Sequence, residues 1–273
     1  IRSCLVGSEM CIRDSYYNRP ADRTDDFNEL SARAGISTTL DSINYFAQIS
    51  LGFRPPQINE AYRLQKKQNV TDLDSETLTM FEFGSKFELE SLMGSLSFYQ
   101  SKKKNSIFRD SQNFIVDNGK TDHKGVELSL SIFVNLRNTI NANITYGDHR
   151  YDFETDTSMR EKIRVDNKID TAPKIMANLL WNINLNDDSN LSLEIEHMDS
   201  YYTDAANLHE YEGHTLYHAR FNREFSESLK GYLRIENLTD KRYAERADFN
   251  AFGGDRYFPG LPREVYVGLE YNF

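Results

Sequence analysis

Residues 263–273 read REVYVGLEYNF, and their side chains alternate between polar and apolar up to the last residue. Every second position is apolar or aromatic, at Val265, Val267, Leu269, Tyr271 and Phe273. Successive side chains of a β-strand point to opposite sides, so this stretch predicts a strand with two chemically different faces. The polar face carries two carboxylates and one amide, and only Tyr266 interrupts it with an aromatic ring.

The same alternation recurs along most of the chain. It marks segments near 263–273, 228–239, 214–225, 189–199, 172–184, 137–147, 121–134, 91–104, 75–88, 42–53 and 28–38, with a weaker one near 106–116. One such segment alone is typical of an antiparallel strand that covers a soluble core. Ten or more in succession, joined alternately by tight turns and by long polar connections expected at 54–74, 105–120, 148–171, 200–213 and 240–262, are typical of an outer-membrane barrel. We therefore expect an all-β fold, an antiparallel up-and-down transmembrane β-barrel.

The composition of the 273 residues excludes several classes of protein. The net charge of -10 makes a phosphate-binding surface for nucleic acid improbable, so we expect no nucleic acid partner. Aromatic residues make up 12% of the chain, which argues against disorder, and no stretch of 18 apolar residues predicts a membrane-spanning helix. The nucleotide-binding, metalloprotease and nucleophile motifs of common enzymes are absent, so we expect no catalytic residues, no metal site and no cofactor.

The first 15 residues, IRSCLVGSEMCIRDS, differ from the rest of the chain. They show neither a period of 2 nor one of 3.6, and LVGSEMCIRDS resembles a translated sequencing adapter. They also lack the charged start and apolar stretch of a secretory signal, which suggests a truncated sequence. We expect residues 1–15 to be non-native or disordered and residues 16–273 to form one barrel unit.

Two stretches carry a family resemblance. GFRPPQINEAYR at 52–63 and the tail IENLTDKRYAERADF at 235–249, followed by RYFPGLPREVYVGLEYNF at 256–273, resemble TonB-dependent outer-membrane receptors. The resemblance implies a receptor in the outer membrane of a Gram-negative bacterium that contacts outer-membrane lipid and imports a scarce nutrient, most simply a ferric siderophore or another metal complex. It also implies energy supplied by the periplasmic TonB protein.

The family also has a plug domain, a TonB box and a barrel of about 22 strands. This sequence contains neither the plug nor the box, and only about half the strands. We therefore expect residues 16–273 to be the C-terminal part of a receptor barrel. A fragment of about 10–12 strands should form an open curved sheet or half barrel, and TonB should couple through the N-terminal part of the receptor.

The long connections should lie opposite the C-terminus, because Phe273 should end at the periplasm and each strand reverses direction. Their aromatic and basic residues are the predicted ligand-binding set: Arg54, Tyr62, Arg63, Tyr201, Tyr202, Tyr211, Arg246, Phe249, Arg256 and Tyr257. Aromatic faces offer contact area to an amphipathic ligand, and Arg binds carboxylate or catecholate oxygens in a fixed fork. The resemblance adds that Phe273 belongs to the signal read by the outer-membrane assembly machinery.

Two other functions fit parts of the sequence. A passive outer-membrane porin would share the strand pattern without a plug or a TonB box. A soluble β-rich ligand-binding domain would share the alternation, but it has no reason to keep all long loops at one end. His197, His209, His214 and His218 gather around one loop, yet their spacing matches no compact set of metal ligands.

Overall fold

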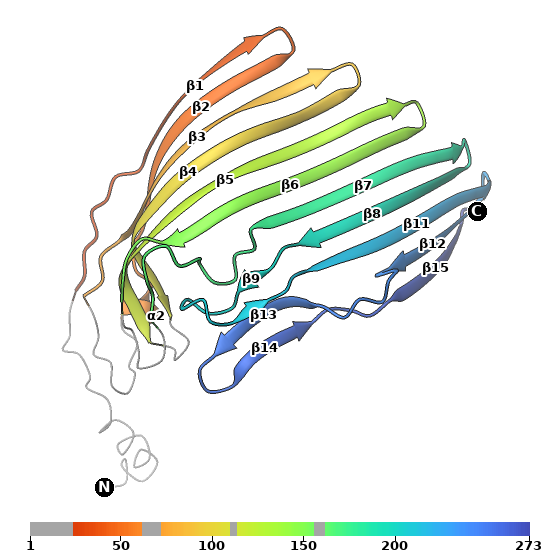
Figure 1. Cartoon of the computed structure of the whole chain (residues 1–273). Helices are drawn as coiled ribbons and strands as arrows, with labels where there is room; N and C mark the ends of the chain where they lie inside the picture. Colours follow the sequence, from red (N-terminus) through yellow and green to blue (C-terminus); the bar gives the residue numbers. More distant parts are fainter. Residues whose placement is uncertain (1–23, 62–71, 110–113, 156–161) are drawn as a thin grey trace, which may run out of the picture.

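The computed structural model describes residues 24–61, 72–109, 114–155 and 162–273, which form an all-β fold around one large antiparallel sheet (Figure 1). Its eleven strands are β1 (Ala32–Leu40), β2 (Ile43–Arg54), β3 (Glu76–Leu89), β4 (Leu92–Arg109), β5 (Ile115–Asn135), β6 (Asn138–Tyr151), β7 (Ile175–Asn186), β8 (Ser189–Met198), β11 (His214–Ser226), β12 (Leu229–Glu236) and β15 (Glu264–Tyr271). Each strand pairs with the next one named, and the sheet is curved and open. The predicted fold class is confirmed.

The connections between these strands differ sharply at the two edges of the sheet. Tight turns join β1 to β2, β3 to β4, β5 to β6, β7 to β8 and β11 to β12, and Figure 1 shows them on the same edge as the C-terminus. The opposite edge, here called the loop edge, carries the long connections. It also carries α2 (Ile58–Ala61) and two short hairpins, β9 (Tyr201–Tyr202) with β10 (Glu210–Tyr211) and β13 (Ala244–Asn250) with β14 (Gly254–Pro259).

The prediction of a long polar connection at 105–120 is wrong, because β4 and β5 continue to pair beyond the neighbouring strands. Phe108 pairs with Val116 and Arg109 with Ile115, so both described ends of the weak segment near 106–116 belong to these two strands. Burial explains the extension: Ile107 packs in a small cluster with residues of α2 and of the segment before β3. Residues 1–15 lie outside the described part of the chain.

The register of the sheet collects the apolar side chains on one face. Successive cross-strand partners are Leu92, Ile132, Ile140, Trp181 and Leu193. Cross-strand partners lie on the same side of a sheet, so the apolar positions of separate segments join into one continuous surface. We call this surface the apolar face.

The opposite side of the sheet, the polar face, is held by side-chain hydrogen bonds between strands. Ser129 donates to Asn143 at 2.8 Å, and Asn178 donates to Glu194 at 2.7 Å. Ser192 likewise donates to Asn182, at 2.8 Å. Short polar side chains therefore pair across the strands and stay accessible to water.

A second layer does not cover the apolar face within the described residues. Val267 and Leu269 are each 74% exposed, whereas buried clusters are small and lie at the loop edge. Apolar area removed from water stabilises by about 25 cal/mol per Å², so such a face needs a nonaqueous neighbour. Among the residues that the structure describes, no helix is long and apolar enough to cross a membrane.

The C-terminal motif, residues 235–249 and 256–273, contains hydrogen bonds across the long connection between β12 and β15, and we call this set of contacts the clamp. Asn237 is buried with a left-handed φ of 50°, and its amide donates to the carbonyl oxygens of Lys241 at 2.9 Å and Leu261 at 3.2 Å. Asp240 accepts the backbone N–H of Arg263 at 3.0 Å. The two halves of the motif therefore bind each other across the loop.

Tyr243 completes this clamp. A Cβ atom added at Gly260 would lie 2.1 Å from the Tyr243 ring, so only glycine allows the ring to lie against the backbone there. The Gly260 N–H also donates to the Tyr243 carbonyl oxygen at 3.1 Å. Asn237, Asp240, Tyr243 and Gly260, which belong to the stretches that resemble the family, thus hold the two ends of this loop together.

The two faces of β8 predict opposite effects of a charge. Leu193→Arg, on the apolar face, should lower the free energy of unfolding by about 2–4 kcal/mol because arginine then enters hydrocarbon. Glu194→Arg, on the polar face, loses the hydrogen bond from Asn178 and meets water. The folded fraction is measured in the full-length protein refolded into phosphatidylcholine vesicles. Equal losses in both variants would contradict the expected contact of the apolar face with lipid.

Candidate functional site

The predicted ligand-binding residues that the structure describes all lie toward the loop edge, in two groups. Arg54 ends β2, whereas the remaining residues belong to the two short hairpins: Tyr201, Tyr202, Tyr211, Arg246, Phe249, Arg256 and Tyr257. Tyr62 and Arg63 lie outside the described residues. Within the hairpin group, the arrangement brings together residues up to 56 positions apart in the sequence, from Tyr201 to Tyr257.

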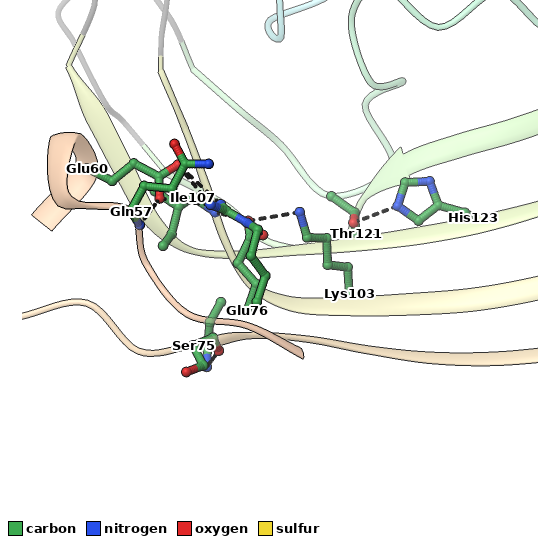
Figure 2. Close-up of polar contacts among 10 residues, drawn as sticks. Gln57, Glu60, Ser75, Glu76, Lys103, Ile107, Thr121 and His123 are labelled. Atoms are coloured by element: carbon green, nitrogen blue, oxygen red, sulfur yellow. Dashed lines mark hydrogen bonds and ion pairs between the residues drawn. The ribbon is translucent and has the colours of Figure 1, made fainter. Parts of the chain in front are cut away.

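Arg54 belongs to a polar cluster around Glu76 at the start of β3 (Figure 2). Its Nε atom lies 2.5 Å from one carboxylate oxygen of Glu76, and Lys103 Nζ lies 2.8 Å from the other. The backbone N–H of Ile107 also donates to Glu76, at 2.7 Å. Glu60 of α2 binds the Arg54 guanidinium from the far side, at 2.9 Å. The cluster therefore ties β2, α2, β3 and β4 together.

Glu76 is 3% exposed and acts as the shared anion of this cluster. Burial alone raises the pKa of its carboxyl, but the hydrogen bonds from Arg54, Ile107 and Lys103 outweigh burial, and the pKa lies below its ordinary value. The hydrogen bonds to Glu76 and Glu60 raise the pKa of Arg54. The Arg54 guanidinium is thus engaged by two carboxylates and holds the start of the loop.

In the second group, two tyrosines fasten the hairpins to each other. Tyr201 and Tyr211 are buried, 6% and 8% exposed. The Tyr201 hydroxyl accepts the N–H of Ala247 at 2.7 Å and donates to its carbonyl oxygen at 3.2 Å. Tyr211 makes the same pair of hydrogen bonds with Ala244. These tyrosines therefore place the β13–β14 hairpin, and their rings face the protein interior.

The outer surface of that hairpin carries two arginines around one carboxylate. Asp248 binds Arg256 at 2.6 Å and Arg246 at 3.3 Å, and its own side chain is 11% exposed. The arginine side chains remain 51% and 65% exposed. Asp248 therefore orients both guanidinium groups but balances only one of their charges. Sequence reasoning missed Asp248, although its position two residues from Arg246 places both on one face of a strand.

The aromatic neighbour of these arginines is Phe258, whose ring centre lies 5.8 Å from Arg246 Cζ. Phe249 and Tyr257 belong to the alternate rows of the hairpin and therefore to its other face. Phe249 stacks on His209 with ring centroids 3.8 Å apart, and His209 Nδ1 lies 3.1 Å from the Asp255 carboxylate. Tyr257 is 57% exposed, with its ring centroid 6.3 Å from that of Tyr211. One face of the hairpin thus presents the two arginines with Phe258, and the other face carries Tyr257 and Phe249. Tyr202 lies apart from the hairpin, with its ring centre 5.8 Å from the Lys168 ammonium.

Titratable groups at the loop edge form no compact metal site. Among the described residues, no group of three or more His, Cys, Asp or Glu could hold a metal ion. The histidines near the hairpins have separate partners: His214 Nδ1 lies 2.9 Å from the Tyr211 hydroxyl, and His197 Nδ1 lies 2.9 Å from the Thr215 hydroxyl. The Nδ1 atoms of His123 and His149 lie 2.9 Å apart, closer to the loop edge than the apolar residues that pair across β5 and β6. Burial lowers the pKa of His123 to about 4.

Comparison with known proteins identifies the family to which this fold belongs. The family model "TonB dependent receptor-like, beta-barrel" matches residues 12–238. The ferric-catecholate import receptor Fiu of E. coli K12 is similar in structure, with 17% identity, a TM-score of 0.72, and coverage of 89% of this chain and 35% of Fiu. The siderophore receptor PiuA of Acinetobacter baumannii is 18% identical, with a TM-score of 0.73 and coverage of 88% of this chain and 35% of PiuA. The copper transporter OprC is 16% identical, with a TM-score of 0.70 and coverage of 89% of this chain and 39% of OprC. A comparison with curated protein sequences finds no match.

The open antiparallel sheet with two unlike faces and one-sided loops is part of the barrel of an outer-membrane receptor. The chain belongs to the TonB-dependent receptor family, whose members reside in the outer membrane of Gram-negative bacteria. It spans little more than a third of the length of the solved receptors that it resembles, 35% to 37% for the first four.

Glu76 lies outside the membrane-spanning part of β3, because it stands 13 residues from the tight turn at Leu89 and a crossing needs about 9–11 residues. Its lowered pKa contributes stability above the ordinary value of 4.5, and this stability is lost as the pH falls through the folded-state pKa. We expect Glu76→Gln to lower the free energy of unfolding by about 1–2 kcal/mol, a modest loss because Arg54 and Lys103 are partly exposed.

The measurement is urea unfolding of the full-length receptor in detergent at pH 7 and at pH 3. The difference between Glu76→Gln and the unmodified protein should be smaller at pH 3, because the pH is then below the ordinary value of 4.5 and the stability contributed by the charge decreases as the pH approaches the lowered folded-state pKa. Glu154→Gln, at an exposed position that makes no ion pair within the described residues, is the matched control and should change neither value. A Glu76→Gln effect of the same size at both pH values would show that the Glu76 charge is not what matters.

Proposed function

We propose that residues 16–273 form the C-terminal part of the barrel of a receptor that imports a metal complex, most simply a ferric siderophore, with energy from TonB. The observation that supports this most is a family fold whose long connections all gather at one edge, above a hydrogen-bonded polar face. Solved structures with the same fold include a ferric-catecholate receptor, siderophore receptors and a ferric citrate transporter. The apolar face contacts outer-membrane lipid, and the polar face lines the passage.

The loop edge supplies a surface suited to capture of such a ligand. Arg246, Arg256 and Tyr257 are more than half exposed on one hairpin, the two arginines on one face beside Phe258 and Tyr257 on the other. Guanidinium groups bind catecholate or carboxylate oxygens in a bidentate fork, and the aromatic ring contacts the apolar body of the ligand. Asp248 prevents the two arginines from repelling each other by binding both.

The other residues of the predicted set have supporting roles in this proposal. Tyr201 and Tyr211 fasten the hairpin from beneath, and Arg54 secures the start of another loop. Phe249 buttresses the hairpin through its stacking on His209. Tyr202, Tyr62 and Arg63 stay predicted ligand contacts. Coupling to TonB passes through parts of the receptor outside this chain.

Phe273 is proposed to belong to the assembly signal at the end of the last strand. Its side chain is fully exposed, and its ring meets that of Tyr271 edge to face with centroids 5.1 Å apart. The terminal residue is therefore available to a partner on the edge of the sheet that carries the tight turns.

The test of transport compares cells that express the complete receptor with and without a functional TonB. Accumulation of iron-55 from ferric catecholate, hydroxamate and citrate complexes is measured in both. We expect accumulation of at least one complex in the TonB-containing cells only. Uptake that persists without TonB would favour a passive porin, and no uptake of any iron complex would contradict the proposed ligand class.

The binding role of the hairpin predicts a loss of affinity in the Arg256→Ala/Tyr257→Ala double variant. A hydrogen bond to a charged group contributes about 1.5–3 kcal/mol, so the dissociation constant of the transported complex should rise roughly tenfold or more. Tryptophan fluorescence quenching in detergent measures this constant. Arg137→Ala, at the edge with the tight turns, is the matched control and should bind normally. Unchanged affinity in the double variant would remove this hairpin from the site.

A further inference from the structure

The apolar face carries an aromatic groove near the loop edge. Phe83, Phe98, Val126 and Tyr146 are successive cross-strand partners on β3 to β6. Phe83 and Phe98 stack with centroids 5.0 Å apart, and the groove that these residues share with Phe81 has a volume of about 450 Å³. Such a groove is wide enough for a hydrocarbon chain.

Cationic side chains border this groove on its loop-edge side. In the next row of partners Lys124 lies between Gln100 and Asp148, and in the row beyond it Lys102 faces Asp122. Both rows belong to the apolar face, because partners keep the same side and the face alternates along each strand. Lys174 joins from the β6–β7 connection, with Nζ 5.2 Å from the centre of the Tyr146 ring.

Positive charge exceeds negative charge around these lysines: Lys102, Lys124, Lys174 and Arg150 are four cations, and the carboxylates in the same rows are Asp122 and Asp148. Lys102, Lys124 and Lys174 are exposed, and within the described ranges none of them makes an ion pair with a carboxylate. Asp148 is instead paired with Arg150, at 2.9 Å. A chain with a net charge of -10 therefore concentrates an excess of positive charge at one place beside an apolar groove.

The height of the lysines matches the boundary of the hydrocarbon. Lys102 lies ten residues beyond Leu92, where β4 begins, and Lys124 lies eleven residues before Asn135, where β5 ends. A tilted strand crosses the hydrocarbon in about 9–11 residues. The tight turns face the periplasm in barrels of this type, so the lysines reach the headgroup level of the outer leaflet.

We propose that Lys102, Lys124 and Lys174, together with the aromatic groove, bind a phosphate-bearing lipid of the outer leaflet. The lysines bind the phosphate oxygens, and one acyl chain lies in the groove along Phe98 and Tyr146. The phosphate neutralises the excess positive charge of the lysines, and the acyl chain covers aromatic rings that are otherwise exposed. The site faces lipid, so it is distinct from the proposed ligand surface on the β13–β14 hairpin and independent of the imported complex.

The test uses the complete receptor in a non-ionic detergent, with native mass spectrometry to measure binding. The probe is bisphosphorylated lipid A, compared with phosphatidylethanolamine and inorganic phosphate. Each lysine near a phosphate contributes about 1 kcal/mol, so Lys102→Gln and Lys124→Gln should each weaken lipid A binding about fivefold and the double variant roughly 25-fold. Lys124→Arg should retain binding, because the charge remains.

Lys86→Gln is the matched control, since Lys86 is an exposed lysine on the polar face of β3, opposite Asn44. It should bind lipid A normally. Unchanged binding by the double variant, or an equal loss in Lys86→Gln, would overturn the proposal. Displacement of the lipid by inorganic phosphate at the same concentration would also overturn it, because the groove would then contribute nothing. Heat-modified mobility in gels confirms that each variant is folded before its binding is compared.

Discussion

The structure depends on one constraint, the alternation of side chains along a strand, because a single sheet has to satisfy two different surroundings at once. Leu193 and Glu194 are neighbours in sequence and lie on opposite faces. Neighbouring strands satisfy the backbone hydrogen-bonding groups within the sheet, except along the outer edges of β1 and β15, and such pairing is what allows a strand to lie in hydrocarbon. The modest apolar content of 39% follows, since only one face needs to be apolar.

The loop edge is stabilised in a different way from the sheet. Its apolar clusters are small, and buried polar groups with several partners supply the remaining order. Glu76 accepts hydrogen bonds from two cationic side chains and one backbone N–H, and Asn237 binds both halves of the C-terminal motif. Buried polar groups are costly when unpaired and specific when paired, so these contacts define single positions for long loops.

Positively charged side chains lie at two separate places on the sheet and its loops, one proposed to bind the imported complex and the other a membrane lipid. Arg246 and Arg256 lie at the loop edge with Asp248 between them, where a soluble anionic ligand can reach them. Lys102 and Lys124 lie on the apolar face, at the height that we propose for the lipid headgroups. The overall charge of the chain gives no hint of either, since local arrangement rather than net charge decides what a surface binds.

The sequence by itself determined the strands, because alternation is a local property and survives in each segment separately. All eleven strongly alternating segments are strands of the sheet, and the C-terminal motif indicated the family. The tertiary structure alone decided which loop residues face outward. Tyr201 and Tyr257 look equivalent in sequence, yet one is 6% and the other 57% exposed. Burial in a loop depends on partners such as Ala247, 46 residues from Tyr201, and no local period encodes a contact over that separation.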